Sequence, residues 1–135
     1  MTSIPERINI FLKAPAFAVI GASSNREKYG NKVLRAYLQN NLTVYPVNPK
    51  EAQIENIPCY KTVADLPNDV QSLSIITKPE ITEQVVAQAL QKNIKNIWMQ
   101  PGAESQKAIK FCEDNGMNVI ADGSCALVVL KYHEK

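Results

Sequence analysis

The stretch from Ala16 to Val33 limits the possible fold more than any other part of this sequence. Five apolar residues, Ala16 to Ile20, run directly into Gly21, a polar loop follows, and a helical pattern begins near Gly30. A short apolar run that ends at glycine before a helix predicts the first strand, turn and helix of a nucleotide-binding α/β domain. Such a turn directs backbone N–H groups and a helix N-terminus toward an anion above the strand ends.

The glycine spacing in this turn differs from that of dinucleotide-binding domains. Only Gly21 and Gly30 are present, nine positions apart, so the G-x-G-x-x-G pattern is missing. The residues between them carry hydroxyl, amide and basic side chains: Ser23, Ser24, Asn25, Arg26 and Lys28. We therefore expect a longer loop that offers hydroxyls and positive charge to a phosphate.

The rest of the chain alternates short apolar runs with amphipathic helical patterns. Further strands are expected at 43–47, 73–76, 96–99 and 118–121. Helices are expected at 4–13 (with a capping box at Ser3 and Glu6), 31–40, 81–92 and 105–115, with one helical turn at 62–67 and a C-terminal tail at 124–135. Apolar strands between helices predict a parallel sheet covered on both faces. The predicted fold is a single α/β domain over 1–135, Rossmann-like, doubly wound and three-layered (αβα), with about five strands in the order 3-2-1-4-5.

Composition narrows the choice of partners. Hydrophobic content of 45% and charged content of 21% are ordinary for a soluble globular protein. The net charge of +2 gives no support for binding to nucleic acid or to an anionic membrane. The first residues contain charges and lack a signal peptide's apolar segment, and no apolar run reaches the length of a membrane span. We expect a cytoplasmic protein without a nucleic-acid or membrane partner, and the sequence identifies no protein partner.

The cysteines and the single histidine limit the chemistry. Cys59, Cys112 and Cys125 are far apart and odd in number, so neither a disulfide scaffold nor a zinc site is expected. The only histidine, His133, is in the tail, so we expect no metal site and no histidine-based catalysis. Cys112 and Trp98 are expected in the core.

Four polar clusters follow the predicted strands, where a doubly wound sheet binds its ligand. They are residues 21–24, 47–50, 76–79 and 99–102, around an expected switch point between the first and fourth strands. Asn48 stands where an NAD site has an acidic residue, and no P-loop pattern occurs. The basic residues near the crevice, Arg26, Lys28, Lys32 and Lys50, suit a ligand with a pyrophosphate and a further ribose phosphate. NADP and coenzyme A (CoA) both fit that description.

At these residues the sequence resembles the stand-alone CoA-binding-domain proteins of bacteria and archaea. That family is similar to the N-terminal domain of the succinyl-CoA ligase α subunit. The matching segments lie between about Ile8 and Val128, and are 18–23, 32–33, 44–49, 59–60, 64–67, 77–79, 97–102 and the turn at Cys125. The Pro-Val-Asn-Pro run at 46–49, joined to the turn at Gly21, is the most specific pair.

The resemblance implies a Rossmann-like fold that binds CoA across the strand ends, and it assigns a part of the ligand to each cluster. It places Gly21, Ala22, Ser23, Gly30 and Asn31 at the phosphates, where the charge pattern described above adds Arg26 and Lys32 as candidate cations. It places Asn48, Pro49 and Lys50 at the adenosine end, Thr77, Lys78 and Pro79 along the other side of the nucleotide, and Gln100, Pro101 and Gly102 where the pantetheine arm emerges.

The expected function is therefore binding of CoA or acyl-CoA without catalysis. The ligase relatives use a phosphorylated histidine in a second domain, and this sequence has neither that domain nor an internal histidine. Two alternatives stay open. One is an NADP-dependent reductase, with Tyr29, Tyr45 or Tyr60 as proton donor. The other is a regulatory subunit that senses acyl-CoA or is thiolated at Cys125 or Cys59, although an inert thiol is the favoured interpretation of Cys125.

Overall fold

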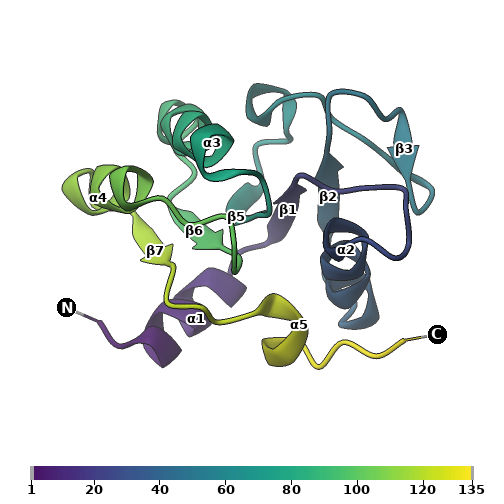
Figure 1. Cartoon of the computed structure of the whole chain (residues 1–135), viewed down its shortest axis with the longest axis horizontal. Coiled ribbons are helices and arrows are strands. Elements are labelled where there is room, and N and C mark those ends of the chain that lie inside the picture. Colours follow the sequence, from purple (N-terminus) through teal and green to yellow (C-terminus); the bar gives the residue numbers. More distant parts are fainter. Residues whose placement is uncertain (1, 135) are drawn as a thin grey trace.

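A five-stranded parallel sheet forms the centre of the computed structural model, which describes residues 2–134. Its strands are β1 (Ala16–Ile20), β2 (Val44–Val47), β5 (Val70–Ile75), β6 (Asn96–Met99) and β7 (Asn118–Ile120). The helices α3 (Pro79–Gln91) and α4 (Gln106–Asp114) cover one face. The other face carries α1 (Ile4–Leu12), α2 (Tyr29–Gln39) and α5 (Ala126–Val129) (Figure 1). The predicted αβα Rossmann-like class is confirmed.

Each face of the sheet has its own apolar core because strand residues alternate between the faces. In β1, Ala18 and Ile20 pack toward α3, whereas Phe17 and Val19 pack toward α1 and α2. The second core is aromatic: the ring of Phe11 lies 5.7 Å from Phe17 and 5.3 Å from Trp98 between centroids. Trp98 is fully buried, as predicted, and its indole N–H donates to the Ser124 carbonyl at 3.0 Å.

The strand order differs from the prediction. The sheet runs β2-β1-β5-β6-β7, so the predicted order 3-2-1-4-5 is wrong: the third main strand, β5, pairs with β1 and not with β2. Pro46 gives the physical reason. Proline has no N–H to donate and is confined to edge strands, and the Pro46 carbonyl accepts from the Tyr60 N–H at 3.0 Å on the outer side of β2. The switch point therefore lies between β1 and β5, not between the first and fourth strands.

Two short elements were not expected from the sequence. The segment after β2, where the sequence pattern predicted no strand, forms a small hairpin of β3 (Gln53–Ile54) and β4 (Ile57–Pro58). Its turn places Glu55 and Asn56 at φ of 50° and 65°. The apolar run of the C-terminal tail folds into α5, where Ala126 and Leu130 are buried in the same core as α2. The predicted helical turn near 62–67 is the 3-10 helix η1 (Val63–Asp65).

The remaining boundaries agree closely with the sequence-based expectations. β6 has the predicted bounds, and the helices start or end within about two residues of prediction, which is the normal uncertainty of such boundaries. The exception is β5, which was predicted at 73–76 but begins earlier, at Val70. The capping box is confirmed, since the Ser3 hydroxyl oxygen accepts from the Glu6 N–H at 3.3 Å. None of the helices found within residues 2–134 combines the length and apolar character needed to cross a bilayer.

Tyr37 should make stability depend on alkaline pH. Its ring is fully buried, and burial raises the pKa of its hydroxyl well above the usual value, against the opposing effect of a 2.5 Å hydrogen bond with Ser74. Tyrosine in the unfolded chain ionises at about pH 10, while Tyr37 in the folded protein keeps its proton. The contribution of Tyr37 to the unfolding free energy is therefore complete below about pH 10 and is lost as the pH rises further.

We expect the unfolding free energy to fall by about 1.4 kcal/mol per pH unit from this residue alone above pH 10. Urea unfolding between pH 9 and 11.5 measures the slope, and Tyr37→Phe is the comparison. The variant loses stability at every pH because Ser74 loses its partner, but its alkaline slope should be shallower. Equal slopes in the two proteins would contradict the assignment.

Candidate functional site

A cavity of about 300 Å³ lies at the carboxyl ends of β1, β2 and β5. Its walls come from those strand ends, from η1 and from one side of α3. The lining residues are Ile20, Gly21, Val47, Asn48, Pro49, Lys61, Thr62, Val63, Thr77, Ile81, Gln84, Val85 and Gln88. The cavity therefore spans the switch point between β1 and β5, which is where open parallel sheets bind their ligands.

Gly21 forms the tight turn at the floor of this cavity. Its φ of +93° is a conformation that residues with a side chain rarely adopt, and a Cβ there would lie 3.3 Å from Thr77 Cγ2. The Gly21 N–H donates to the Val47 carbonyl at 3.1 Å. Asn48 fixes the next turn, because its Nδ2 donates to the Ala22 carbonyl at 2.8 Å. The turns after β1 and β2 thus form one hydrogen-bonded unit.

Gly30 and Asn31 hold α2 against that unit. A Cβ at Gly30 would lie 2.4 Å from the Gly21 carbonyl oxygen, so only glycine allows this close approach. Asn31 is fully buried; its Nδ2 donates to the Ser23 carbonyl at 2.8 Å, and its Oδ1 accepts from Arg35 Nε at 2.6 Å. Its backbone N–H donates to the Lys28 carbonyl at 3.1 Å. These contacts give both residues a packing role in the turn.

The predicted basic residues are spread around the site. Arg26 lies outside the cavity lining and pairs with Glu55 at 2.5 Å. Lys32 also lies outside the lining, 4.0 Å from Glu134. Lys50 and Lys78 are exposed and adjoin the lining residues Pro49 and Thr77 in sequence. Pro79 opens α3 as its first residue.

Lys61 lines the cavity and was not identified from the sequence. The bridge between Val47 and Tyr60 brings it there, by returning the chain alongside β2 after the β3–β4 hairpin. Thr62 and Val63 reach the cavity wall by the same path. No local pattern in the sequence marks that return.

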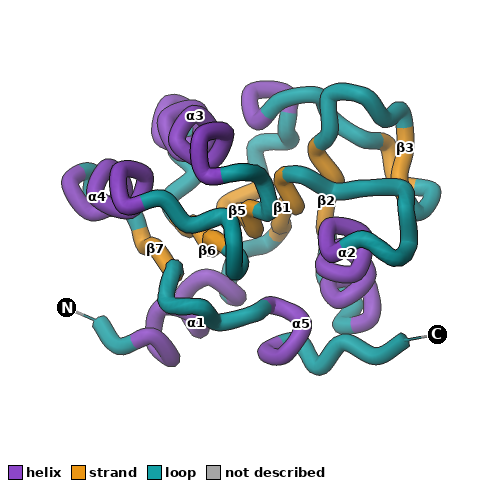
Figure 2. The backbone as a smooth tube through the Cα atoms, viewed as in Figure 1, coloured by secondary structure: helices purple, strands orange, loops and turns teal. Residues whose placement is uncertain are grey.

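Two carboxylates meet the loop between β1 and α2, which runs beside the β3–β4 hairpin before turning into α2 (Figure 2). Ser24 donates to the Glu51 carboxylate from its hydroxyl at 2.6 Å and from its N–H at 3.2 Å. The Ser24 hydroxyl, and then its N–H, hold the pKa of Glu51 below its usual value. Partial burial raises the pKa of Glu55, but hydrogen bonds from Asn31 and Arg26 outweigh it, and the net shift is downward.

A separate polar cluster follows β6 and β7. Gln100 is fully buried, and its Oε1 accepts from the Tyr29 hydroxyl at 3.0 Å and from the Ala126 N–H at 2.8 Å. The Tyr29 oxygen lies 2.7 Å from Cys125 Sγ. Burial, followed by Cys125, raises the pKa of Tyr29. Within residues 2–134, Gln100 Nε2 has no hydrogen-bond partner.

The other residues predicted near this end of the sheet are exposed. Pro101 and Gly102 form the turn after β6, where Gly102 has a φ of +97° and donates its N–H to Glu104 at 2.8 Å. None of these residues lines the cavity. The structure thus separates the Gln100 turn from the cavity at β1, β2 and β5.

The other two cysteines, Cys59 and Cys112, are half-buried and buried thiols respectively. Burial raises the pKa of Cys59, whose Sγ donates to the Asn48 carbonyl at 3.6 Å. Cys112 is a core residue, as predicted, and burial raises its pKa to about 12. Within residues 2–134, no group of three or more His, Cys, Asp or Glu side chains is arranged to hold a metal ion.

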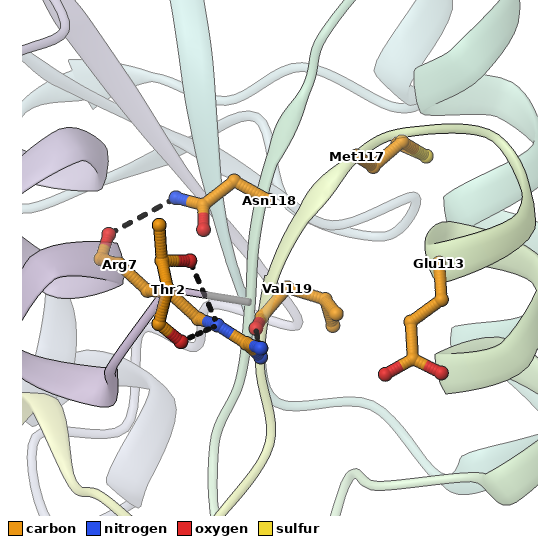
Figure 3. A pocket seen from close by; sticks show the side chains of 6 residues that line it. All are labelled: Thr2, Arg7, Glu113, Met117, Asn118 and Val119. Atoms are coloured by element: carbon orange, nitrogen blue, oxygen red, sulfur yellow. Dashed lines mark hydrogen bonds between the residues drawn. The ribbon is translucent and has the colours of Figure 1, made fainter.

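A second hollow, of about 360 Å³, lies at the amino end of β7, where Arg7 and Glu113 also line it (Figure 3). The Arg7 guanidinium there is used within the chain: it donates to the Val119 carbonyl at 3.0 Å and to the Thr2 carbonyl at 3.1 Å. Asn118 donates to the Arg7 carbonyl at 3.0 Å. These bonds attach α1 to the outer edge of β7, so we assign the polar side chains at this hollow a role in stabilising the fold.

The parallel sheet, with its cavity at the switch point, defines a Rossmann-like α/β domain. The chain belongs to the CoA binding domain family, whose family model matches residues 15–131. This match confirms the resemblance found in the sequence.

Known proteins similar to this chain fall into two groups by length. Acetate–CoA ligase (ADP-forming) II of Archaeoglobus fulgidus is 31% identical over 113 residues, which are 82% of this chain but 17% of the ligase. A conserved hypothetical protein from Pyrococcus furiosus is 38% identical with a TM-score of 0.81, covering 84% of this chain and 97% of that one. A hypothetical protein from Pyrococcus horikoshii OT3 is 28% identical with a TM-score of 0.87, covering 96% and 93%. The chain therefore spans less than a fifth of the ligase but nearly the full length of the two solved proteins.

Proposed function

We propose that this chain binds CoA or an acyl-CoA at the carboxyl ends of β1, β2 and β5, without catalysing a reaction of its own. The observation that carries the proposal is the cavity at the switch point, in a chain that belongs to the CoA binding domain family. A volume of about 300 Å³ is at the lower end for ligand pockets. It suits the adenosine part of the ligand, with the remainder lying along the strand ends.

The residues that line the cavity are of the kinds that bind a flat base and a phosphorylated ribose. Val63, Ile81 and Val85 supply apolar walls for a purine, and Asn48 and Thr77 supply polar groups at the strand ends. Ammonium groups bind phosphates through charge-assisted hydrogen bonds. Lys61 lines the cavity, and the exposed Lys50 and Lys78 follow the lining residues Pro49 and Thr77 in sequence. These three lysines are the cations available to bind the phosphates.

The same lining residues also favour binding of the ligand without catalysis. Among its residues, Lys61 is the only ionisable one. General acid–base catalysis uses a positioned donor or acceptor with a suitable pKa, and Tyr29, Tyr45 and Tyr60 are not among the lining residues. The pKa values of the half-buried thiol of Cys59 and of the buried thiol of Cys112 are both raised, which favours their protonated forms.

Isothermal titration calorimetry with CoA, acetyl-CoA, NADP and NAD tests the proposal. We expect one CoA or acetyl-CoA bound per chain, with NAD giving no heat. Removing the 3′-phosphate, in dephospho-CoA, should weaken binding about tenfold, because charge-assisted hydrogen bonds are worth about 1.5–3 kcal/mol each.

Two results would contradict the proposal. Absence of heat with CoA, while circular dichroism shows folded protein, removes CoA as the ligand. Tighter binding of NADP than of CoA favours the reductase instead. A mass increase of one CoA after incubation with CoA disulfide would support the thiolated subunit.

A further inference from the structure

The loop after β1 is hydrogen-bonded to a carboxylate of the protein itself. The hydroxyl and the N–H of Ser24 both donate to the same oxygen of Glu51, at 2.6 and 3.2 Å. Ser24 lies three residues beyond Gly21, in the turn where Rossmann-like domains direct backbone N–H groups at a ligand phosphate. A carboxylate from the segment after β2 therefore occupies donors that the phosphate of a bound ligand would use.

Glu51 differs from its neighbour Glu55 in how firmly it is held. The Glu55 side chain is 19% exposed, and it bonds to the buried Asn31 and to Arg26, which fastens the β3–β4 hairpin to α2. Glu51 precedes the hairpin, and its carboxylate is bonded to Ser24, an exposed residue. Displacing Glu51 breaks no buried contact, whereas displacing Glu55 would.

We propose that Glu51 is a specificity-determining residue of the CoA site: its carboxylate occupies the Ser24 donors in the free protein, and the ligand's pyrophosphate displaces it. The inference rests on the proposed function. Two anions cannot share the same two donors, and a like charge a few ångströms away opposes phosphate binding. A ligand must therefore offer enough additional contacts, at the cavity and its lysines, to replace Glu51. A simple anion such as inorganic phosphate offers none of these.

Glu51→Gln tests the inference, because glutamine keeps the size of the side chain and removes its charge. We expect this variant to bind CoA about fivefold more tightly than the unmodified protein by calorimetry, which corresponds to one like-charge contact close to water. Glu113→Gln is the matched control. It makes the same charge change on an exposed residue at the end of α4, beside the hollow at the amino end of β7, and should leave CoA affinity unchanged.

The outcomes separate this inference from the proposed function. Equal or weaker CoA binding by Glu51→Gln overturns the inference while CoA binding itself stands. If no variant binds CoA, the proposed function fails, and titration with inorganic pyrophosphate, followed at the Ser24 amide by NMR, then tests whether Glu51 competes with an anion for the Ser24 donors. A shift of that amide at lower pyrophosphate concentration in Glu51→Gln than in the unmodified protein supports displacement. Identical titrations overturn it.

Discussion

Gly30→Ala should destabilise the protein by about 2 kcal/mol, although alanine is the better helix former by about 1 kcal/mol. The added Cβ would lie 2.4 Å from the Gly21 carbonyl oxygen and 3.2 Å from the Ala22 Cα. Both neighbours are backbone atoms of the turn after β1, so no side chain can rotate away. Either α2 or the turn must move, and the turn is fixed by the bond between Gly21 and Val47.

Urea unfolding measures this cost, and Gly116→Ala is the control. Gly116 has a φ of +70° with no atom within 4 Å of an added Cβ, so its substitution costs only backbone strain, about 1 kcal/mol. We expect the Gly30 variant to lose more stability than the Gly116 variant. If the Gly30→Ala protein is more stable than the unmodified one, the gain in helix propensity exceeds the steric cost, and the close approach of α2 to the turn after β1 is contradicted.

The alternation of strands and helices could be predicted because it depends on local pattern. Apolar runs such as Ala16–Ile20 and the capping residue Ser3 identify their elements without reference to the rest of the chain. The order of the strands depends on which strand can lie at the edge of the sheet. Pro46 in β2 was the available signal, since an inner strand would need the N–H that proline lacks.

The hairpin at 53–58 left no such signal. Its strands are two residues long, and its turn uses Glu55 and Asn56 at positive φ where glycine would have marked it. Non-glycine residues in that conformation are uncommon, so sequence patterns give little warning of them.

The candidate site was predictable to the extent that it follows strand ends. Gly21, Asn48, Pro49 and Thr77 line the cavity because the carboxyl ends of parallel strands meet at one edge. Residues that reach the site from a distance were not predictable. Lys61 arrives through the return of the chain past β2, and Glu51 meets Ser24 from 27 positions away. These contacts depend on the path of the loops, which local periodicity does not record.

Gly21→Val should remove measurable CoA binding, a loss of about 100-fold or more. Valine at a φ of +93° is strained, and its Cβ would lie 3.3 Å from Thr77 Cγ2, at the floor of the cavity. The variant therefore narrows the proposed adenosine position and distorts the turn that faces the phosphates. Calorimetry with CoA measures the loss, and urea unfolding measures the accompanying fall in stability.

Because Gly21→Val strains the fold, a second variant fills the same cavity without touching the turn. Gln84 lines the cavity from the exposed side of α3, so Gln84→Trp should weaken CoA binding at least about tenfold and leave stability nearly unchanged. Gln91→Trp places the same bulk on the same helix, outside the cavity lining, and should bind CoA normally. If Gln84→Trp and Gln91→Trp bind CoA equally well, the ligand does not enter the cavity between β1, β5 and α3, and the strand-end assignment of Gly21, Asn48 and Thr77 fails with it.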